Sequence, residues 1–221
     1  MITRPCFLFS LALIAVTASA RAPQDANISS KPRSPQTSRS TARSSKPSVP
    51  QDENLYQNSE FGFRYKTILG WVDRTEEMQP EQKPASAADP HSGKVLLAVF
   101  ERPPEVQSDT LNPAVIVAEE SAASYPGLKS AADYVGPLTQ LVTARGFKPS
   151  GDPAEVTLDG RSLVQCDFKR DDAKRSAFQS TLILLQKGSV VSFTFIASTQ
   201  EEVEDLIEKL SFQPAPSAKA K

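Results

Sequence analysis

Two side chains in this sequence could carry nucleophilic or acid–base chemistry, Cys166 and His91. The chain holds one histidine and two cysteines, and the second cysteine, Cys6, lies in an apolar N-terminal run. A histidine beside a cysteine can activate the thiol as a nucleophile. A hydrolytic or redox enzyme that uses His91 or Cys166 is therefore one hypothesis. A zinc site needs three or four ligands, and one histidine with one cysteine cannot supply them.

The sequence around both residues favours structural roles. Cys166 alternates with Val164 and Phe168, the pattern of a strand with one apolar face. A free thiol on such a face usually packs as a small hydrophobic side chain. His91 lies in the polar segment 88–93, which contains no second histidine, and we expect an exposed loop residue there.

Two charged groups could also form a site. The acidic and basic residues of segment 167–172 lack the central glycine and terminal glutamate of a calcium loop, so they predict a solvated hairpin turn. The acidic residues of segment 201–208 fit the start and the outer face of a helix, and none of them stands out as a catalytic pair. The sequence singles out no catalytic, cofactor-binding or metal-binding residue. We expect a protein that is not an enzyme and has no cofactor.

Residues 1–20 have the three parts of a secretory signal peptide. Arg4 supplies the positive charge, an apolar run of about eleven residues follows, and Ala18-Ser19-Ala20 matches a cleavage site. That run is too short to span a hydrocarbon core of about 30 Å. We expect a periplasmic or secreted protein with no transmembrane helix after cleavage, and an uncleaved anchor is the alternative.

Residues 21–52 are rich in serine, proline and arginine and have six basic residues against two acidic ones. Such a segment cannot bury enough apolar surface to fold, so we expect a disordered linker. It is either a spacer or a weak basic contact with an anionic envelope surface. Residues 53–221 carry a net charge of −6 (18 basic, 24 acidic), which argues against nucleic acid as a partner. Residues 214–221 read as a disordered tail.

Residues 53–213 are long enough to form a single globular domain. Strands are expected at 61–65, 71–74 and 95–100, with a surface loop at 76–92. Segment 114–119 fits a strand or a short helix. A helix should begin at Ser130, end near Arg145 and be interrupted near Pro137, because an interior proline breaks helical hydrogen bonding.

From residue 155 the pattern changes to four strands of an antiparallel meander. Their turns are expected at Asp159-Gly160, Asp171-Asp172 and Lys187-Gly188. A final helix follows, with Ser198 and Glu201 as its capping box. Its apolar stripe should cover one face of the meander. That stripe consists of Val203, Leu206, Ile207 and Leu210. The expected class is α+β.

The order of these elements resembles the PsbP-like superfamily. The motif Phe61-Gly62-Phe63, followed after a turn by Gly70-Trp71, is the part of the sequence that carries the resemblance. The resemblance covers most of residues 54–212 and fits a bacterial exported member of unassigned function. It implies a central antiparallel sheet flanked by helices, an α/β/α sandwich, in which Trp71 packs against the sheet. It also implies a binding or assembly role without catalysis.

Three functions therefore stay open at this point. The first is an exported, non-enzymatic binding or accessory module for a protein partner or an envelope component. The second is a carrier that holds an apolar molecule between a helix and the sheet, which would require a sizeable apolar pocket. The third is the enzyme that uses His91 or Cys166.

Overall fold

The computed structural model describes residues 54–80, 93–172 and 175–213. The expected signal peptide, the expected linker, the expected tail and His91 all lie outside these residues. Among the described residues, no helix is long and apolar enough to cross a membrane.

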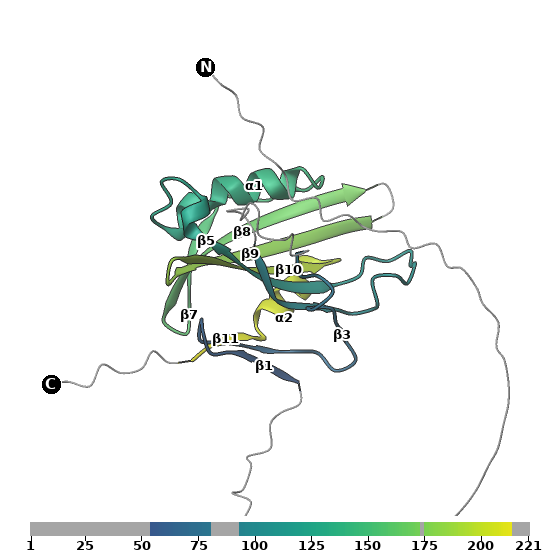
Figure 1. The fold of residues 1–221 in the computed structure, drawn as a ribbon. Coiled ribbons are helices and arrows are strands. Elements are labelled where there is room, and N and C mark those ends of the chain that lie inside the picture. The colour runs from purple at the N-terminus through teal and green to yellow at the C-terminus, as the bar shows by residue number, and fades with distance from the viewer. Residues whose placement is uncertain (1–53, 81–92, 173–174, 214–221) are drawn as a thin grey trace, which may run out of the picture. The chain divides into compact units, whose positions relative to one another are not determined.

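The described residues form a mostly antiparallel α+β fold (Figure 1). The strands are β1 (Leu55–Asn58), β2 (Phe63–Lys66), β3 (Val72–Asp73), β4 (Lys94–Phe100), β5 (Ala114–Ser121), β6 (Lys148–Pro149), β7 (Ala154–Leu158), β8 (Arg161–Asp172), β9 (Arg175–Gln186), β10 (Ser189–Ala197) and β11 (Leu210–Phe212). The α-helices are α1 (Val135–Thr143) and α2 (Gln200–Ile207). The 3₁₀ helices are η1 (Ala122–Ser124) and η2 (Ala131–Tyr134).

The expected meander is the centre of an eight-stranded antiparallel sheet. The strand order is β3-β4-β5-β10-β9-β8-β6, and β7 also pairs with β8. Segment 114–119, which the sequence left open, forms strand β5. Two of the expected turns are confirmed, since Asp159-Gly160 and Lys187-Gly188 have positive φ at both residues as type I′ hairpin turns require. Asp171 and Asp172 are strand residues instead, because β8 continues through them.

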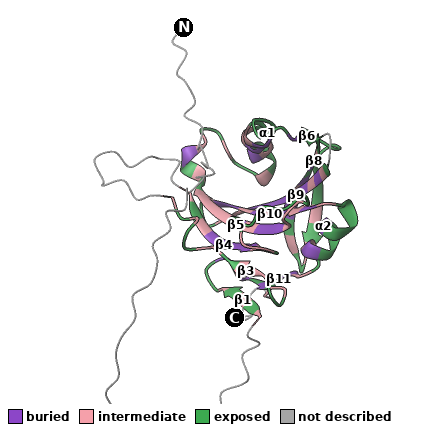
Figure 2. Ribbon diagram, turned by 90° about the vertical axis from the view of Figure 1, so that its right-hand side faces the viewer, coloured by how far each residue is buried: buried purple, intermediate pink, exposed green. Residues whose placement is uncertain are grey.

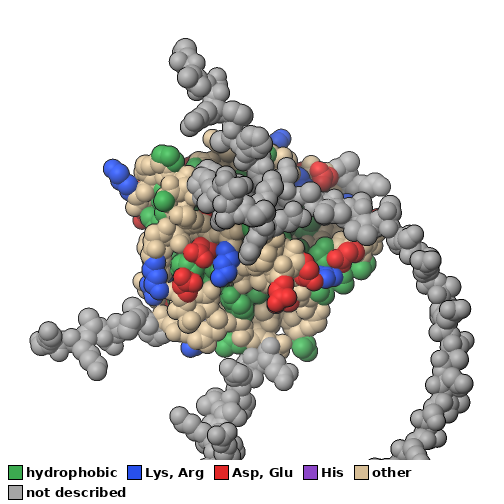
Figure 3. Space-filling model, viewed as in Figure 1, with side chains coloured by type: hydrophobic (Ala, Val, Ile, Leu, Met, Phe, Trp, Pro, Cys, Tyr) green, Lys and Arg blue, Asp and Glu red, His purple; other side chains and the backbone are tan. Residues whose placement is uncertain are grey.

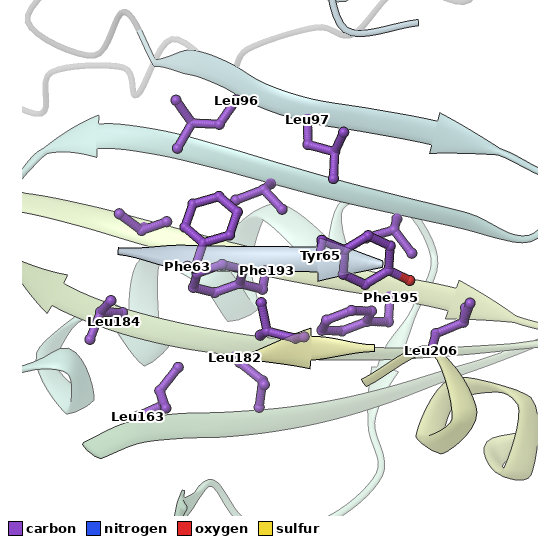
Figure 4. Close-up of a cluster of buried hydrophobic side chains, with 14 of the residues drawn as sticks. Phe63, Tyr65, Leu96, Leu97, Leu163, Leu182, Leu184, Phe193, Phe195 and Leu206 are labelled. Atoms are coloured by element: carbon purple, nitrogen blue, oxygen red, sulfur yellow. The ribbon is translucent and has the colours of Figure 1, made fainter. Parts of the chain in front are cut away.

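Both faces of the large sheet are buried (Figure 2). On one face, which we call the α2 face, helix α2 and strands β1, β2 and β11 cover the main core. Phe63 and Phe193 pack there with their rings edge to face (Figure 4). Phe212 packs in the same way against Phe193. Trp71 is half-buried and packs against this cluster, as the resemblance implied. On the opposite α1 face, α1 and η2 cover a second cluster that includes Leu138 and Val142.

One of the two layers that cover the large sheet contains strands as well as a helix, whereas only helices were expected there. The sequence analysis did not predict the three-stranded sheet of order β1-β2-β11 on the α2 face. It also assigned Leu210 to the apolar stripe of the last helix, which was wrong. Helix α2 ends at Ile207, and Leu210 pairs with Tyr65 of β2. The α2 face is therefore covered by a helix together with a small sheet.

Capping hydrogen bonds explain where the helices begin. Ser130 and Asp133 form a capping box, which opens η2 at the expected helix start, and α1 begins afresh at Val135. Pro137 lies in the first turn of α1, where its missing N–H loses no intrahelical hydrogen bond. The expected capping box of Ser198 and Glu201 was wrong by one residue. Thr199 caps α2, its hydroxyl accepts from the Glu202 backbone N–H, and the Glu202 carboxylate accepts from the Thr199 N–H.

Candidate partner-binding surface

Cys166 is a core residue, as its alternation with apolar neighbours predicted. It is 3% exposed and packs in the α1-face cluster with Val164 and Phe168. Burial is the larger cause and the nearby Asp167 carboxylate the smaller one, and together they raise the pKa of the thiol to about 11. At neutral pH the thiol is therefore protonated, and only the thiolate is a good nucleophile.

The acidic residues of α2 lie on its exposed face. Glu202 is used in the helix cap, and Glu204 accepts a hydrogen bond from Gln200 at 2.9 Å. Among the described residues, no group of three or more histidine, cysteine or carboxylate side chains is placed to hold a metal ion.

A tyrosine–glutamate network fixes the loop that follows β5. The Glu120 carboxylate accepts from the phenol of Tyr134 at 3.1 Å and from that of Tyr125. The two rings stack edge to face with centroids 5.0 Å apart. Burial raises the pKa of both phenols, so they stay neutral donors. This network fastens η1 and η2 to the sheet.

Basic residues gather where β8 ends and β9 begins. In Figure 1 this end of the two strands lies near the C-terminal end of α1. The backbone carbonyl of Arg145 accepts a hydrogen bond from Arg170 at 3.4 Å, and β6 pairs with β8 at Lys148 and Lys169. These contacts join residues that are more than twenty positions apart in the sequence. We call this surface the cationic end. It consists of Arg145, Lys148, Lys169, Arg170 and Arg175.

Two lysines of the cationic end lie directly opposite each other. Lys148 and Lys169 are register partners on β6 and β8, so their side chains project from the same face of the sheet. Like charges at such positions destabilise a sheet. One carboxylate, Asp171, lies 3.2 Å from the Lys169 ammonium. The pKa of Asp171 is lowered by the Ser176 hydroxyl, then by Lys169 and at longer range by Lys148.

Two cations of the cationic end contact aromatic rings, and the other three form no ion pair with a described residue. The Arg170 guanidinium lies 4.7 Å from the centre of the Phe147 ring, and the Lys169 ammonium lies 5.2 Å from that of Phe178. Such cation–π contacts orient a charge without neutralising it. Arg170 also pairs with Asp172 at 3.4 Å. Among the described residues, Arg145, Lys148 and Arg175 have no ion-pair partner.

The cationic end differs in charge from the rest of the described chain. Its five cations outnumber the two carboxylates that pair with them, Asp171 and Asp172, and Asp152 and Asp167 lie beside the same surface. The described residues as a whole have 14 basic and 21 acidic side chains. On the face seen in Figure 3, acidic and basic side chains are interspersed. The sequence analysis interpreted segment 167–172 as a solvated turn and gave Arg145 and Lys148 no role. No local pattern links them, because only the pairing of β6 with β8 brings them together.

A cavity of about 220 Å³ opens beside this surface, between α1 and the turn that follows β6. Cys166 and Phe168 form its buried floor, and Val135 and Thr139 of α1 form one wall. Pro149, which follows Lys148, lies on the opposite wall. A larger hollow of about 380 Å³ lies on an exposed loop at Gln107, Ser108 and Asp109 and has no buried floor.

The comparison with solved structures finds a PsbP protein among the chains that are similar to this one. Cyanobacterial PsbP (CyanoP) from Synechocystis sp. PCC 6803 is 12% identical, with 77% of this chain and 99% of that chain covered and a TM-score of 0.45. The Saccharomyces cerevisiae Ran-binding protein Mog1p is 9% identical, with 72% and 95% covered and a TM-score of 0.42.

A third neighbour is LpqN of Mycobacterium tuberculosis, which is involved in cell envelope biogenesis. It is 16% identical, with 72% and 90% covered and a TM-score of 0.38. All three likenesses are weak, with TM-scores below 0.5 and sequence identities of 16% or less. No protein-family model and no curated protein matches the sequence.

Proposed function

We propose that this chain is a non-enzymatic binding module that holds an acidic segment of a partner protein at the cationic end. The observation that carries the proposal is the Lys148–Lys169 pair, two like charges held opposite each other with one carboxylate beside them. An arrangement that is unfavourable in the free protein becomes favourable once a partner supplies negative charge.

The shape of the cationic end favours a protein segment over a flat anionic surface. Side chains alternate between the two faces of a strand, so Lys148 and Lys169 project on the α2 face, and Arg170 projects on the α1 face. Arg175 is the register partner of Asp172 and lies on the side of Arg170. A flexible peptide that wraps around the end of a strand can contact cations on both faces of the sheet. A planar membrane surface can contact the cations of only one face at a time.

We place this binding outside the cytoplasm. The support for this is the N-terminal pattern of Arg4, the apolar run and Ala18-Ser19-Ala20, which is typical of a signal peptide. The protonated state of Cys166 supports a module without thiol chemistry.

The test is the affinity of the full chain for a fluorescent peptide of alternating glutamate and aspartate, measured by anisotropy. The double variant Lys148→Glu/Arg175→Glu reverses two exposed cations that have no ion-pair partner among the described residues. The control Arg64→Glu/Lys66→Glu makes the same change of charge on the exposed face of β2.

We expect the first variant to lose at least tenfold in affinity and the control to lose less than threefold. Binding of the wild-type chain should weaken as salt rises, because exposed charges are screened. Equal losses in both variants would show that net charge and not the cationic end governs binding. Tighter binding to phosphatidylglycerol vesicles than to the peptide would contradict a protein partner.

A further inference from the structure

The cavity beside the cationic end has the size of a site for one side chain. Pockets that bind small molecules usually measure about 300–1,000 Å³, and this one measures about 220 Å³. It is nevertheless far larger than the ~30 Å³ that one water molecule occupies. A single aliphatic side chain fits between these limits.

The inner surface of the cavity is mostly apolar. Phe168 and Cys166 are 2% and 3% exposed and form the floor, and the half-buried Val135 forms part of the wall. The Cys166 thiol is neutral, and the ionisable residues that line the cavity besides it are Asp152 and Asp167. Such a surface stabilises an apolar group by removing it from water.

The outer wall is a stiff turn. Pro149 and Pro153 have fixed φ angles, and the backbone N–H of Ser150 donates to the Asp167 carbonyl at 2.8 Å, which ties the turn to β8. Gly151 adopts φ +147°, a conformation that other residues rarely adopt. A cavity that is already formed binds without the cost of ordering its walls.

The charges around the opening differ from one side to the other. On the side of the strand Arg170 projects from the same α1 face as the floor residue Phe168, while on the opposite wall Asp152 lies on the rim. A bound chain that places its apolar side chain in the cavity meets positive charge where it passes Arg170 and negative charge where it passes Asp152. The acidic part of the partner should therefore extend toward Arg170.

From this juxtaposition we infer that the partner segment combines an acidic run with one aliphatic anchor residue, which enters the cavity. This inference rests on the proposed function and specifies the partner that the cationic end selects. Buried apolar anchors of this kind supply most of the affinity in many interfaces, while charges at the rim contribute to rate and specificity.

The experiment uses the full chain and a series of acidic peptides in which one leucine moves through successive positions, with an all-acidic peptide that carries glycine instead. At least one leucine position should bind tenfold or more tightly than the glycine peptide. In ¹³C NMR spectra, the methyl signals of Val135 and Thr139 should shift with that leucine peptide and stay unchanged with the glycine peptide.

Two variants on neighbouring positions of α1 test the location. Thr139→Phe places a large ring in the cavity, whereas Gln140→Phe adds the same ring at an exposed position that does not line it. The gain from leucine should disappear in the first variant and persist in the second. A gain that persists in Thr139→Phe would overturn the inference.

The remaining outcomes separate this inference from the proposed function. If every peptide binds equally with or without leucine, and Lys148→Glu/Arg175→Glu abolishes binding, the cationic end binds acidic segments but the cavity holds no anchor. If none of the peptides binds, both proposals fail.

Discussion

Two buried tyrosines of this fold have opposite hydrogen-bonding situations. Tyr134 is 3% exposed and donates to the Glu120 carboxylate. Tyr65 is 1% exposed in the main core, and its hydroxyl has no hydrogen-bond partner among the described residues (Figure 4). A buried polar group without a partner lowers stability, whereas the loss of a charge-assisted hydrogen bond costs about 1.5–3 kcal/mol.

We therefore predict opposite effects for the same chemical change. Tyr65→Phe should leave the free energy of unfolding unchanged or raise it by up to about 1 kcal/mol, and Tyr134→Phe should lower it by about 1.5–3 kcal/mol. Urea denaturation of both variants measures these changes. A clear loss of stability in Tyr65→Phe would show that its hydroxyl has a partner in solution.

The buried thiol makes stability depend on pH. The pKa of Cys166 is about 11 in the folded chain, against an ordinary value of 9. Between these values the unfolded chain releases this proton and the folded chain keeps it, so the contribution is complete below pH 9 and is lost as pH rises toward 11. Because one pKa unit corresponds to about 1.4 kcal/mol, the loss amounts to about 2–3 kcal/mol.

Cys166→Ala provides the comparison, because the tyrosines titrate in both proteins. Between pH 8.5 and 11, the wild-type chain should lose about 2–3 kcal/mol more of its unfolding free energy than Cys166→Ala does. Denaturation curves at a series of pH values test this. Parallel pH profiles for the two proteins would contradict the buried, neutral thiol.

At the scale of elements, the cap of α2 depends on one hydroxyl. Thr199 supplies the side-chain oxygen that accepts from the Glu202 N–H at 3.1 Å, whereas Ser198 contributes its backbone N–H to the Glu202 carboxylate. Thr199→Ala should therefore cost about 1 kcal/mol. Ser198→Ala should change stability by less than about 0.5 kcal/mol. Thermal unfolding of the pair measures both, and a larger loss in Ser198→Ala would refute this cap.

The sequence predicted elements well wherever the pattern was local. Alternation placed Cys166 on the apolar face of its strand, because the strand period depends on neighbouring residues. The glycine pairs predicted the turns at Asp159-Gly160 and Lys187-Gly188, because positive φ is also a local property. The local pattern failed at Leu210, which continues the helical spacing of Val203 and Leu206 but lies in β11. Pairing with β2, about 145 positions earlier in the chain, decides that residue, and no local pattern contains that information.

The candidate site was less predictable than the fold for the same reason. From the sequence, Lys169 and Arg170 were considered only as part of a possible cation site, Arg145 only as the end of a helix, and Lys148 not at all. They form one surface because β6 pairs with β8 and because Arg170 reaches the Arg145 carbonyl. The cavity depends equally on long-range packing, since its floor comes from β8 and one wall from α1.

At the scale of the whole molecule, the described chain carries its positive charge unevenly. A net charge of −7 over the described residues (14 basic, 21 acidic) argues against general attraction to polyanions, while the cationic end offers a local positive field. Such a protein should bind acidic partners in one orientation. The affinity for an acidic partner should depend on the charges at the cationic end and hardly on the net charge of the protein.

The most direct measurement of this claim is an NMR titration of the ¹⁵N-labelled full chain with the alternating glutamate–aspartate peptide. We predict that the largest amide shifts cluster at residues 145–148, 168–172 and 175–177, and that they vanish in Lys148→Glu/Arg175→Glu. Shifts that spread evenly over the basic residues, or that centre on β2 or α2, would contradict a binding site at the cationic end.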